Sequence, residues 1–147
     1  MRRALVPSLA IAAAATLLSG CSLLGAGSVQ QFTVGQCVND PVVAEDGQQE
    51  VGTLPVVDCS EPHTGEVFYV QELSGSSVPA DVASQADELC SANFEAFVGL
   101  PYEESSLYLT SLYPTQGSWE QGDRQIVCLI VDGEGDTMTG SAQGSAQ

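Results

Sequence analysis

The sequence predicts an α+β domain in which a mainly antiparallel sheet of about five strands packs on one helix, with two disulfides. Three observations predict it. Short segments rich in β-branched and aromatic residues stand on both sides of a single segment with helical period, turn-forming residues separate them, and four cysteines are spread among them. Strands grouped around one helix are typical of an α+β sandwich. A chain of 147 residues has room for one such domain.

The expected strands share a high content of Val, Phe, Tyr or Leu and end at turn formers such as Asn39, Asp40 and Pro41. They cover residues 32–38, 51–57, 66–73 and 106–113, and the apolar run 126–131. A loop with Gly117, Trp119 and Gly122 precedes the last of them. The chain order is therefore three strands, a helix and two strands.

The helix is expected over residues 79–98, where one stripe of mostly apolar positions recurs at steps of three and four. The stripe consists of Val82, Ala86, Leu89, Cys90, Asn93 and Phe97. Pro79 stands near the start and Gly99 directly follows the end, the usual places for these residues at helix boundaries.

The four domain cysteines, Cys37, Cys59, Cys90 and Cys128, favour two disulfides in an oxidising compartment. Three pairings are possible, and we favour Cys37 with Cys59 and Cys90 with Cys128. Cys90 lies on or beside the apolar helix stripe, so its partner should come from the sheet beneath, where Cys128 fits. A metal site built from the cysteines, or from some of them with His63, is the alternative. The spacings of 22, 31 and 38 contain no Cys-x-x-Cys pair, so neither a metal nor a cofactor is expected.

The amino terminus reads as a secretory signal peptide over residues 1–20, with Arg2 and Arg3 followed by an apolar run. Leu18-Ser19-Gly20-Cys21 resembles the bacterial lipobox, in which the cysteine receives a diacylglyceryl group with acyl chains such as palmitate and becomes the new amino terminus. We therefore expect Cys21 to attach the protein to the outer face of the cytoplasmic membrane without a transmembrane helix. The expected organisation is a lipidated cysteine and flexible tether (21–31), a domain (32–132) and a flexible tail (133–147).

The charge of the chain excludes one class of partner. It carries 19 Asp and Glu against 3 Lys and Arg, a net charge of -16. Removal of residues 1–20 leaves Arg124 as the one basic residue against all 19 acids, a charge of -18. Such a surface cannot neutralise phosphates, so nucleic acid is not expected as a partner.

Three side chains are candidates for a binding role: His63, Trp119 and Arg124. His63 is the single histidine, but no nucleophile-elbow pattern surrounds Ser60 and Cys59 is expected to be oxidised, so no catalytic residue is assigned. We expect His63 to order the loop after Cys59 through a carbonyl or carboxylate. Arg124 is expected to form a structural ion pair with Asp123, Glu120 or the acids near Cys59. Alternatively, Arg124 would receive an anionic ligand group, with Trp119 as a stacking surface.

The acidic segments suggest no enzyme. The alternation of acids and glycines over residues 132–136 resembles part of a calcium loop but lacks the bidentate Glu at the twelfth position, so a solvated turn is expected. The adjacent pairs Asp87-Glu88 and Glu103-Glu104 imply no glycosidase pocket, because neighbouring side chains usually diverge.

Several short motifs together resemble the septum formation family, over roughly Phe32 to Ser141. They are Gly35-Gln36-Cys37, the run Val57-Asp58-Cys59-Ser60-Glu61-Pro62-His63 before Glu66-Val67, Trp119, Gly122-Asp123-Arg124, Val127-Cys128 and Thr139-Gly140-Ser141. The resemblance implies an extracytoplasmic domain of Gram-positive bacteria, anchored by lipid or a transmembrane helix, associated with division septa and without an established catalytic activity.

The expected function is therefore a lipid-anchored binding or scaffolding module of the cell envelope linked to septum formation, with envelope or division proteins as partners. The alternative is a lipoprotein that binds a small ligand or wall fragment in a pocket near Trp119 and Arg124.

Overall fold

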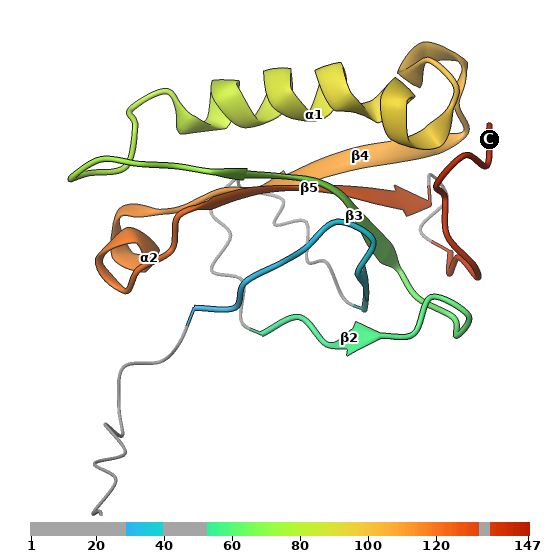
Figure 1. Ribbon diagram of the computed structural model, residues 1–147, viewed down its shortest axis with the longest axis horizontal. Coiled ribbons are helices and arrows are strands. Elements are labelled where there is room, and N and C mark those ends of the chain that lie inside the picture. The colour runs from blue at the N-terminus through green and yellow to red at the C-terminus, as the bar shows by residue number, and fades with distance from the viewer. Residues whose placement is uncertain (1–28, 40–52, 133–135) are drawn as a thin grey trace, which may run out of the picture.

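Helix α1 (Val82–Val98) lies along one face of a five-stranded antiparallel sheet in the computed structural model (Figure 1). The structure describes residues 29–39, 53–132 and 136–147. The strands lie in the order β2-β1-β3-β5-β4. Their bounds are Cys37–Val38 for β1, Val56–Val57 for β2, Gly65–Glu72 for β3, Leu107–Leu112 for β4 and Gln125–Asp132 for β5. The predicted α+β class and its antiparallel sheet are confirmed.

Strand β5 is the centre of the fold because it pairs with both β3 and β4 and is covered on both faces. Its side chains alternate between the faces. Ile126, Cys128 and Ile130 join the hydrophobic cluster beneath α1, and Val127 and Leu129 join a second cluster on the opposite face. Burial on both faces explains why this strand reads as a continuous apolar run in the sequence.

Helix α1 buries one stripe against the sheet and ends where the sequence predicts. Gly99 has a φ of 88° and caps the last turn through its N–H to the carbonyl of Glu95. The predicted stripe is correct at Val82, Ala86, Cys90 and Phe97, and it also includes Phe94 and Val98. Leu89 and Asn93 are half-buried at its edge. Cys90 is bonded to Cys128 of β5, so the predicted disulfide between helix and last strand is confirmed.

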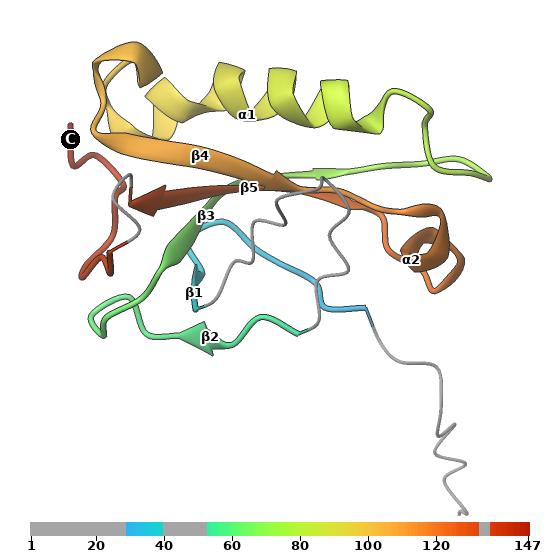
Figure 2. The same ribbon diagram turned by 180° about the vertical axis from the view of Figure 1, so that it is seen from behind.

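The opposite face of the sheet is covered by the N-terminal part of the domain, which Figure 2 shows beneath the strands. Phe32, Val38 and Leu54 pack there against the side chains of Val67 and Leu129. The strands predicted over 32–38 and 51–57 reduce to two residues each in the described part, and these two short strands extend the sheet beyond β3 as its β2-β1 edge. The turn at Gly35 (φ 88°) directs its N–H to the carbonyl of Val67.

Two short helices were not predicted. The 3₁₀ helix η1 (Tyr102–Glu104) follows α1, and α2 (Gln116–Glu120) occupies the loop expected around Trp119. Helix α2 begins at a capping box, in which Thr115 and Ser118 bond reciprocally.

The prediction of a flexible tail is wrong for residues 136–147, which we call the C-terminal strap. Met138 of the strap pairs with His63, Gly140 donates to the carbonyl of Cys59, and Ala142 is buried in the cluster beneath α1. Gly144 and Ala146 donate to the carbonyls of Phe97 and Val98, two of the last residues of α1. Carbonyls at a helix end lack partners within the helix, so the strap satisfies groups that α1 leaves open.

The predicted domain start is also too late by a few residues, because the side chain of Gln30 bonds to both the N–H and the carbonyl of Leu54, each at 2.8 Å. The predicted signal peptide, Cys21 and most of the tether lie outside the described residues, as do residues 133–135 of the predicted acidic turn.

Candidate functional site

The motif segments identified in the sequence meet at two ends of the fold. The segments around Cys37, Cys59, His63 and Glu66 gather under the C-terminal strap. Trp119 belongs to α2, which Figure 1 shows at the opposite end of the sheet, and Arg124 lies against its ring. Within the described ranges, the two fully buried ionisable side chains are His63 and Glu66. The first end is therefore the candidate functional site.

The disulfide Cys37–Cys59 forms one wall of this site and confirms the second predicted pairing. Cys37 lies in β1, directly opposite Glu66 of β3 in the strand register. Directly opposite residues of antiparallel strands project from the same face of the sheet, so the sulfur of Cys37 and the carboxylate of Glu66 are brought together. Cys37 is fully buried and Cys59 is half-buried.

His63 is held by both its backbone and its ring. Its N–H donates to the carbonyl of Met138 at 3.0 Å, and the N–H of Met138 donates back at 2.7 Å. Ring atom Nδ1 lies 2.9 Å from the carbonyl oxygen of Glu61. A carbonyl can only accept, so this hydrogen bond places a proton on Nδ1, and in that tautomer Nε2 is the acceptor. Nε2 is buried and has no hydrogen-bond partner in the described structure.

The ring of His63 thus bonds within the loop after Cys59, the ordering role expected from the sequence. A binding role through direct contact with a partner is not supported, because the side chain is 0% exposed.

Glu66 is a functional candidate that sequence reasoning placed only within a motif. Its carboxylate accepts hydrogen bonds from the hydroxyl of Ser141 and, at 2.6 Å, from the N–H of Ala142. A buried carboxylate is costly unless it is compensated, and hydrogen bonds to an ionised acceptor are the strong kind. The signal in the sequence was an acidic residue directly before the apolar run of β3, because a carboxylate in a buried strand needs hydrogen-bond donors.

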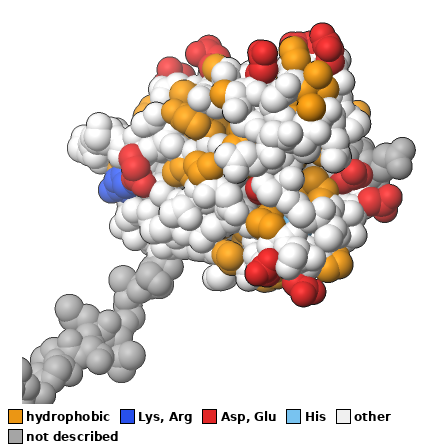
Figure 3. All heavy atoms as spheres, turned by 45° about the vertical axis from the view of Figure 1, so that its right-hand side comes forward, with side chains coloured by type: hydrophobic (Ala, Val, Ile, Leu, Met, Phe, Trp, Pro, Cys, Tyr) orange, Lys and Arg blue, Asp and Glu red, His pale blue; other side chains and the backbone are white. Residues whose placement is uncertain are grey.

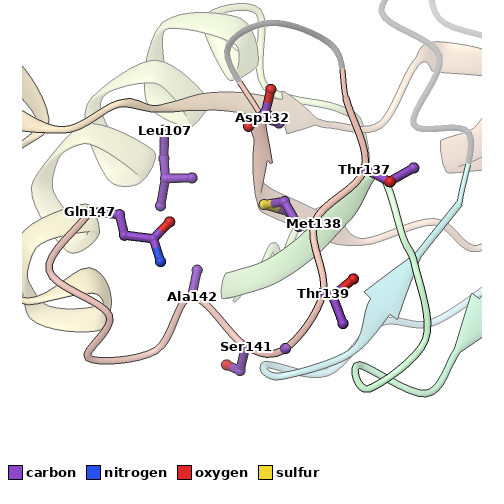
Figure 4. Close-up of a pocket in the computed structure, with 9 residues that line it drawn as sticks. Leu107, Asp132, Thr137, Met138, Thr139, Ser141, Ala142 and Gln147 are labelled. Carbon is purple, nitrogen blue, oxygen red and sulfur yellow. The ribbon is translucent and has the colours of Figure 1, made fainter.

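A small pocket of about 190 Å³ lies beside the strap. Figure 4 shows Leu107 of β4 and Asp132 at the end of β5 on one side, with strap residues around the rest. The strap contributes Thr137, Met138, Thr139, Gly140, Ser141, Ala142 and Gln147. The pocket is thus formed by the same segment that covers Glu66.

At the other end of the sheet, Trp119 is 3% exposed and cannot serve as an open stacking surface. The guanidinium carbon of Arg124 lies 3.9 Å from the centre of its ring, a cation–π contact. The predicted ligand platform at these two residues is therefore corrected: each covers the other.

The expected ion pair of Arg124 is also corrected. Its Nη1 donates to the carbonyl oxygens of Trp119 at 2.7 Å and Asp123 at 2.6 Å, so in the described part of the chain the guanidinium closes the end of α2 through backbone groups. Asp123 uses its carboxylate for Ser118 and for the N–H of Gln125. Arginine is suited to this role because its donors form a rigid planar fork.

Sequence reasoning missed Gln125, a buried amide beside Arg124. Its oxygen accepts from the N–H of Phe32 at 2.8 Å, and its nitrogen donates to Glu72 at 2.7 Å. Gln125 thereby links the start of the domain to the central strand. A glutamine before an apolar run carries no signal that distinguishes this role from an exposed strand end.

Ser60 and Asp58 form a turn beside the site. The N–H and hydroxyl of Ser60 donate to Oδ1 of Asp58 at 2.9 and 2.8 Å. These bonds, the backbone one first, hold the pKa of Asp58 below its ordinary value of 3.8. The hydroxyl of Ser60 therefore interacts with a carboxylate of its own turn and not with the ring of His63.

Comparison with known proteins gives one family. Residues 34–147 match the model of a family described as septum formation. No curated protein and no solved structure matches the chain. Among the described residues, no helix combines the length and hydrophobicity that crossing a membrane requires.

Proposed function

The chain belongs to the septum formation family, and from this we propose that it is an extracytoplasmic binding or scaffolding module of the cell envelope that takes part in septum formation. The family match over residues 34–147 is the observation that carries the proposal, because it covers both disulfides, the buried site and the strap.

The two disulfides support the extracytoplasmic part of the proposal. Disulfides persist in oxidising compartments and are rare where cellular thiols keep cysteines reduced. The lipid anchor at Cys21 is supported by the signal peptide and the lipobox-like tetrad before it.

A binding role is supported over a catalytic one by the state of the candidate nucleophiles. Cys59 is bonded to Cys37, and the Ser60 hydroxyl donates to Asp58. His63, which a nucleophile would need as its base, is enclosed between the strap and the loop after Cys59. We therefore assign no reaction to these side chains.

The charge of the surface indicates the chemistry of the partner. Figure 3 shows acidic side chains at several places around the edge of this face, including its upper, helix side. The exposed side of α1 contributes Asp87, Glu88 and Glu95, whereas Arg124 is engaged with Trp119. Complementary potentials speed encounter and suppress wrong partners, so a partner with a basic surface fits this domain.

Site-specific photocrosslinking in intact dividing cells tests the proposal. Two exposed positions at opposite edges of the sheet are suitable: Tyr108 of β4, 54% exposed, and Val56 of β2, 49% exposed. We expect reproducible crosslinks to division or wall-synthesis proteins from at least one of them, and enrichment of the protein at septa. Uniform distribution with no protein crosslinked from either edge would contradict the scaffolding role.

The anchor needs a separate test. Replacing Cys21 with Ser should release the protein from the membrane fraction and abolish the mass of the attached lipid. Membrane retention of a Cys21→Ser variant from which residues 1–20 have been removed would refute lipid anchoring and leave the septal proposal standing.

A further inference from the structure

Nε2 of His63 is a buried acceptor that the fold orients but leaves without a hydrogen-bond partner. An unsatisfied buried group costs free energy, so it calls for an explanation. In metal-binding histidines one ring nitrogen usually donates a hydrogen bond to a carbonyl or carboxylate, which orients the ring and leaves the other nitrogen free for the metal. The hydrogen bond from Nδ1 of His63 to the carbonyl oxygen of Glu61 is of this kind.

Two further ligand types stand beside this ring. One ligand atom each from Cys37, His63 and Glu66 lie within 4.8 Å of one another, and all three residues are fully buried. We propose that Cys37, His63 and Glu66 form a latent zinc site, which the Cys37–Cys59 disulfide keeps closed.

The donor set suits zinc in chemistry and charge. Thiolate, imidazole and carboxylate are the three ligand types that Zn²⁺ takes in proteins. One thiolate and one carboxylate neutralise the two positive charges of the ion, so the filled site adds no net charge to the protein interior.

The carboxylate of Glu66 has capacity for the ion while the strap stays in place. Its two oxygens offer about four acceptor sites, and the hydrogen bonds from Ser141 and Ala142 use two of them. The ligands must approach one another, because tetrahedral bonds of about 2.0 to 2.3 Å require separations of roughly 3.3 to 3.8 Å.

Opening the site is a redox step. A dithiol reductant transfers two electrons and two protons to the Cys37–Cys59 disulfide and becomes a disulfide itself, which leaves two thiols. Zn²⁺ then replaces the proton of Cys37, and that proton passes to solvent. Cys59, half-buried at the edge of the site, is not one of the three ligands, so the fourth position of the tetrahedron is left to a solvent molecule. Cys37 is thus linked either to Cys59 through the disulfide or to His63 and Glu66 through the metal ion.

The Cys59→Ser variant of the full mature chain opens the site without a reductant, because it leaves Cys37 as a free thiol beside His63 and Glu66. The matched control is Cys90→Ser, which leaves Cys128 as a free buried thiol in the hydrophobic cluster beneath α1. Co²⁺ titration, followed by the thiolate-to-cobalt charge-transfer absorption, should give one bound ion in Cys59→Ser and none in Cys90→Ser. Added Zn²⁺ should displace the cobalt.

Adding His63→Gln to Cys59→Ser should weaken cobalt binding by at least about tenfold. Equal binding by Cys59→Ser and Cys90→Ser, or an unchanged affinity without His63, would overturn the proposal. If Cys59→Ser alone proves unfolded, Zn²⁺ should restore its folded near-ultraviolet circular dichroism, because metal binding couples to folding. Failure of zinc to do so would also refute the site.

Discussion

The N–H of Ala142 donates a 2.6 Å hydrogen bond to the buried carboxylate of Glu66, 76 residues earlier in the chain. This contact fixes the C-terminal strap to the first residues of β3. The strap therefore belongs to the folded core, and its contribution to stability can be measured.

Deletion of residues 136–147 should lower the free energy of unfolding by at least about 3 kcal/mol, because it uncovers a buried carboxylate and leaves helix carbonyls without donors. Chemical denaturation measures the change. Gln143→Ala, an exposed side chain of the same strap, is the control and should stay within about 0.5 kcal/mol of the unaltered protein. A truncated chain as stable as the full one would contradict the structural role of the strap.

Glu66→Gln keeps the shape of the side chain but turns one acceptor into a donor that faces Ser141 or Ala142. We expect a loss of about 1 to 3 kcal/mol in denaturation experiments, the cost of an unsatisfied buried group. Glu95→Gln, on the exposed side of α1, makes the same chemical change in solvent and should have little effect. Equal losses for both variants would show that the Glu66 contacts contribute nothing.

Removal of the Cys90–Cys128 disulfide through Cys90→Ala and Cys128→Ala should cost about 2 to 5 kcal/mol. The Cys37–Cys59 bond closes a shorter loop, with a separation of 22 residues against 38, so the chain-entropy difference between the two is only about 0.5 kcal/mol. Thermal unfolding compares this double variant with the one in which Cys37 and Cys59 are both replaced by Ala. A much larger difference in stability between the two double variants would indicate that packing around one disulfide, rather than loop closure, determines its contribution.

Arg124→Ala should expose the ring of Trp119 and lower stability by about 1 to 2 kcal/mol, since it removes the cation–π contact and two hydrogen bonds. Trp119 is the one tryptophan of the chain, so the tryptophan fluorescence reports directly on the exposure of its ring. Emission should shift to the red, and acrylamide should quench it more strongly. Arg124→Lys keeps the charge without the planar fork and should give an intermediate result; an unchanged spectrum in both variants would contradict the contact.

The side chain of Asp58 should titrate below pH 3.8 in the folded protein, because Ser60 bonds to its ionised form. A depressed folded pKa means that this stabilising contribution is present above the unfolded pKa and is lost as pH falls through the folded one. Ser60→Ala should move the NMR-detected midpoint only part of the way back, since the backbone bond remains. A midpoint at or above 3.8 in the unaltered protein would refute the turn.

The parts of the fold that were predictable depend on local patterns. Cys90 lies on a stripe with helical period and Cys128 in a continuous apolar run, so burial alone brings the two together. The capping of α1 by Gly99 follows from the same local logic.

The parts that were missed depend on partners far away in the sequence. The strap is polar and rich in glycine and serine, and it is ordered only because Glu66, His63 and the end of α1 offer unsatisfied groups. Trp119 could not be distinguished from a surface platform, because the sequence does not show that it lies in α2 with Arg124 against its ring. The family resemblance found the right segments but not the contacts between them.

The position of the strap also sets the order in which the domain can be completed. Chains are made from the amino terminus, so residues 136–147 emerge after the rest of the described domain. In an oxidising compartment Cys37 and Cys59 can join before the strap has docked, whereas Glu66 remains uncovered and the carbonyls of Phe97 and Val98 remain open until the strap arrives. A chain that still lacks residues 136–147 is therefore an intermediate with an exposed site, and protection of this site from proteolysis should appear only once these residues are present.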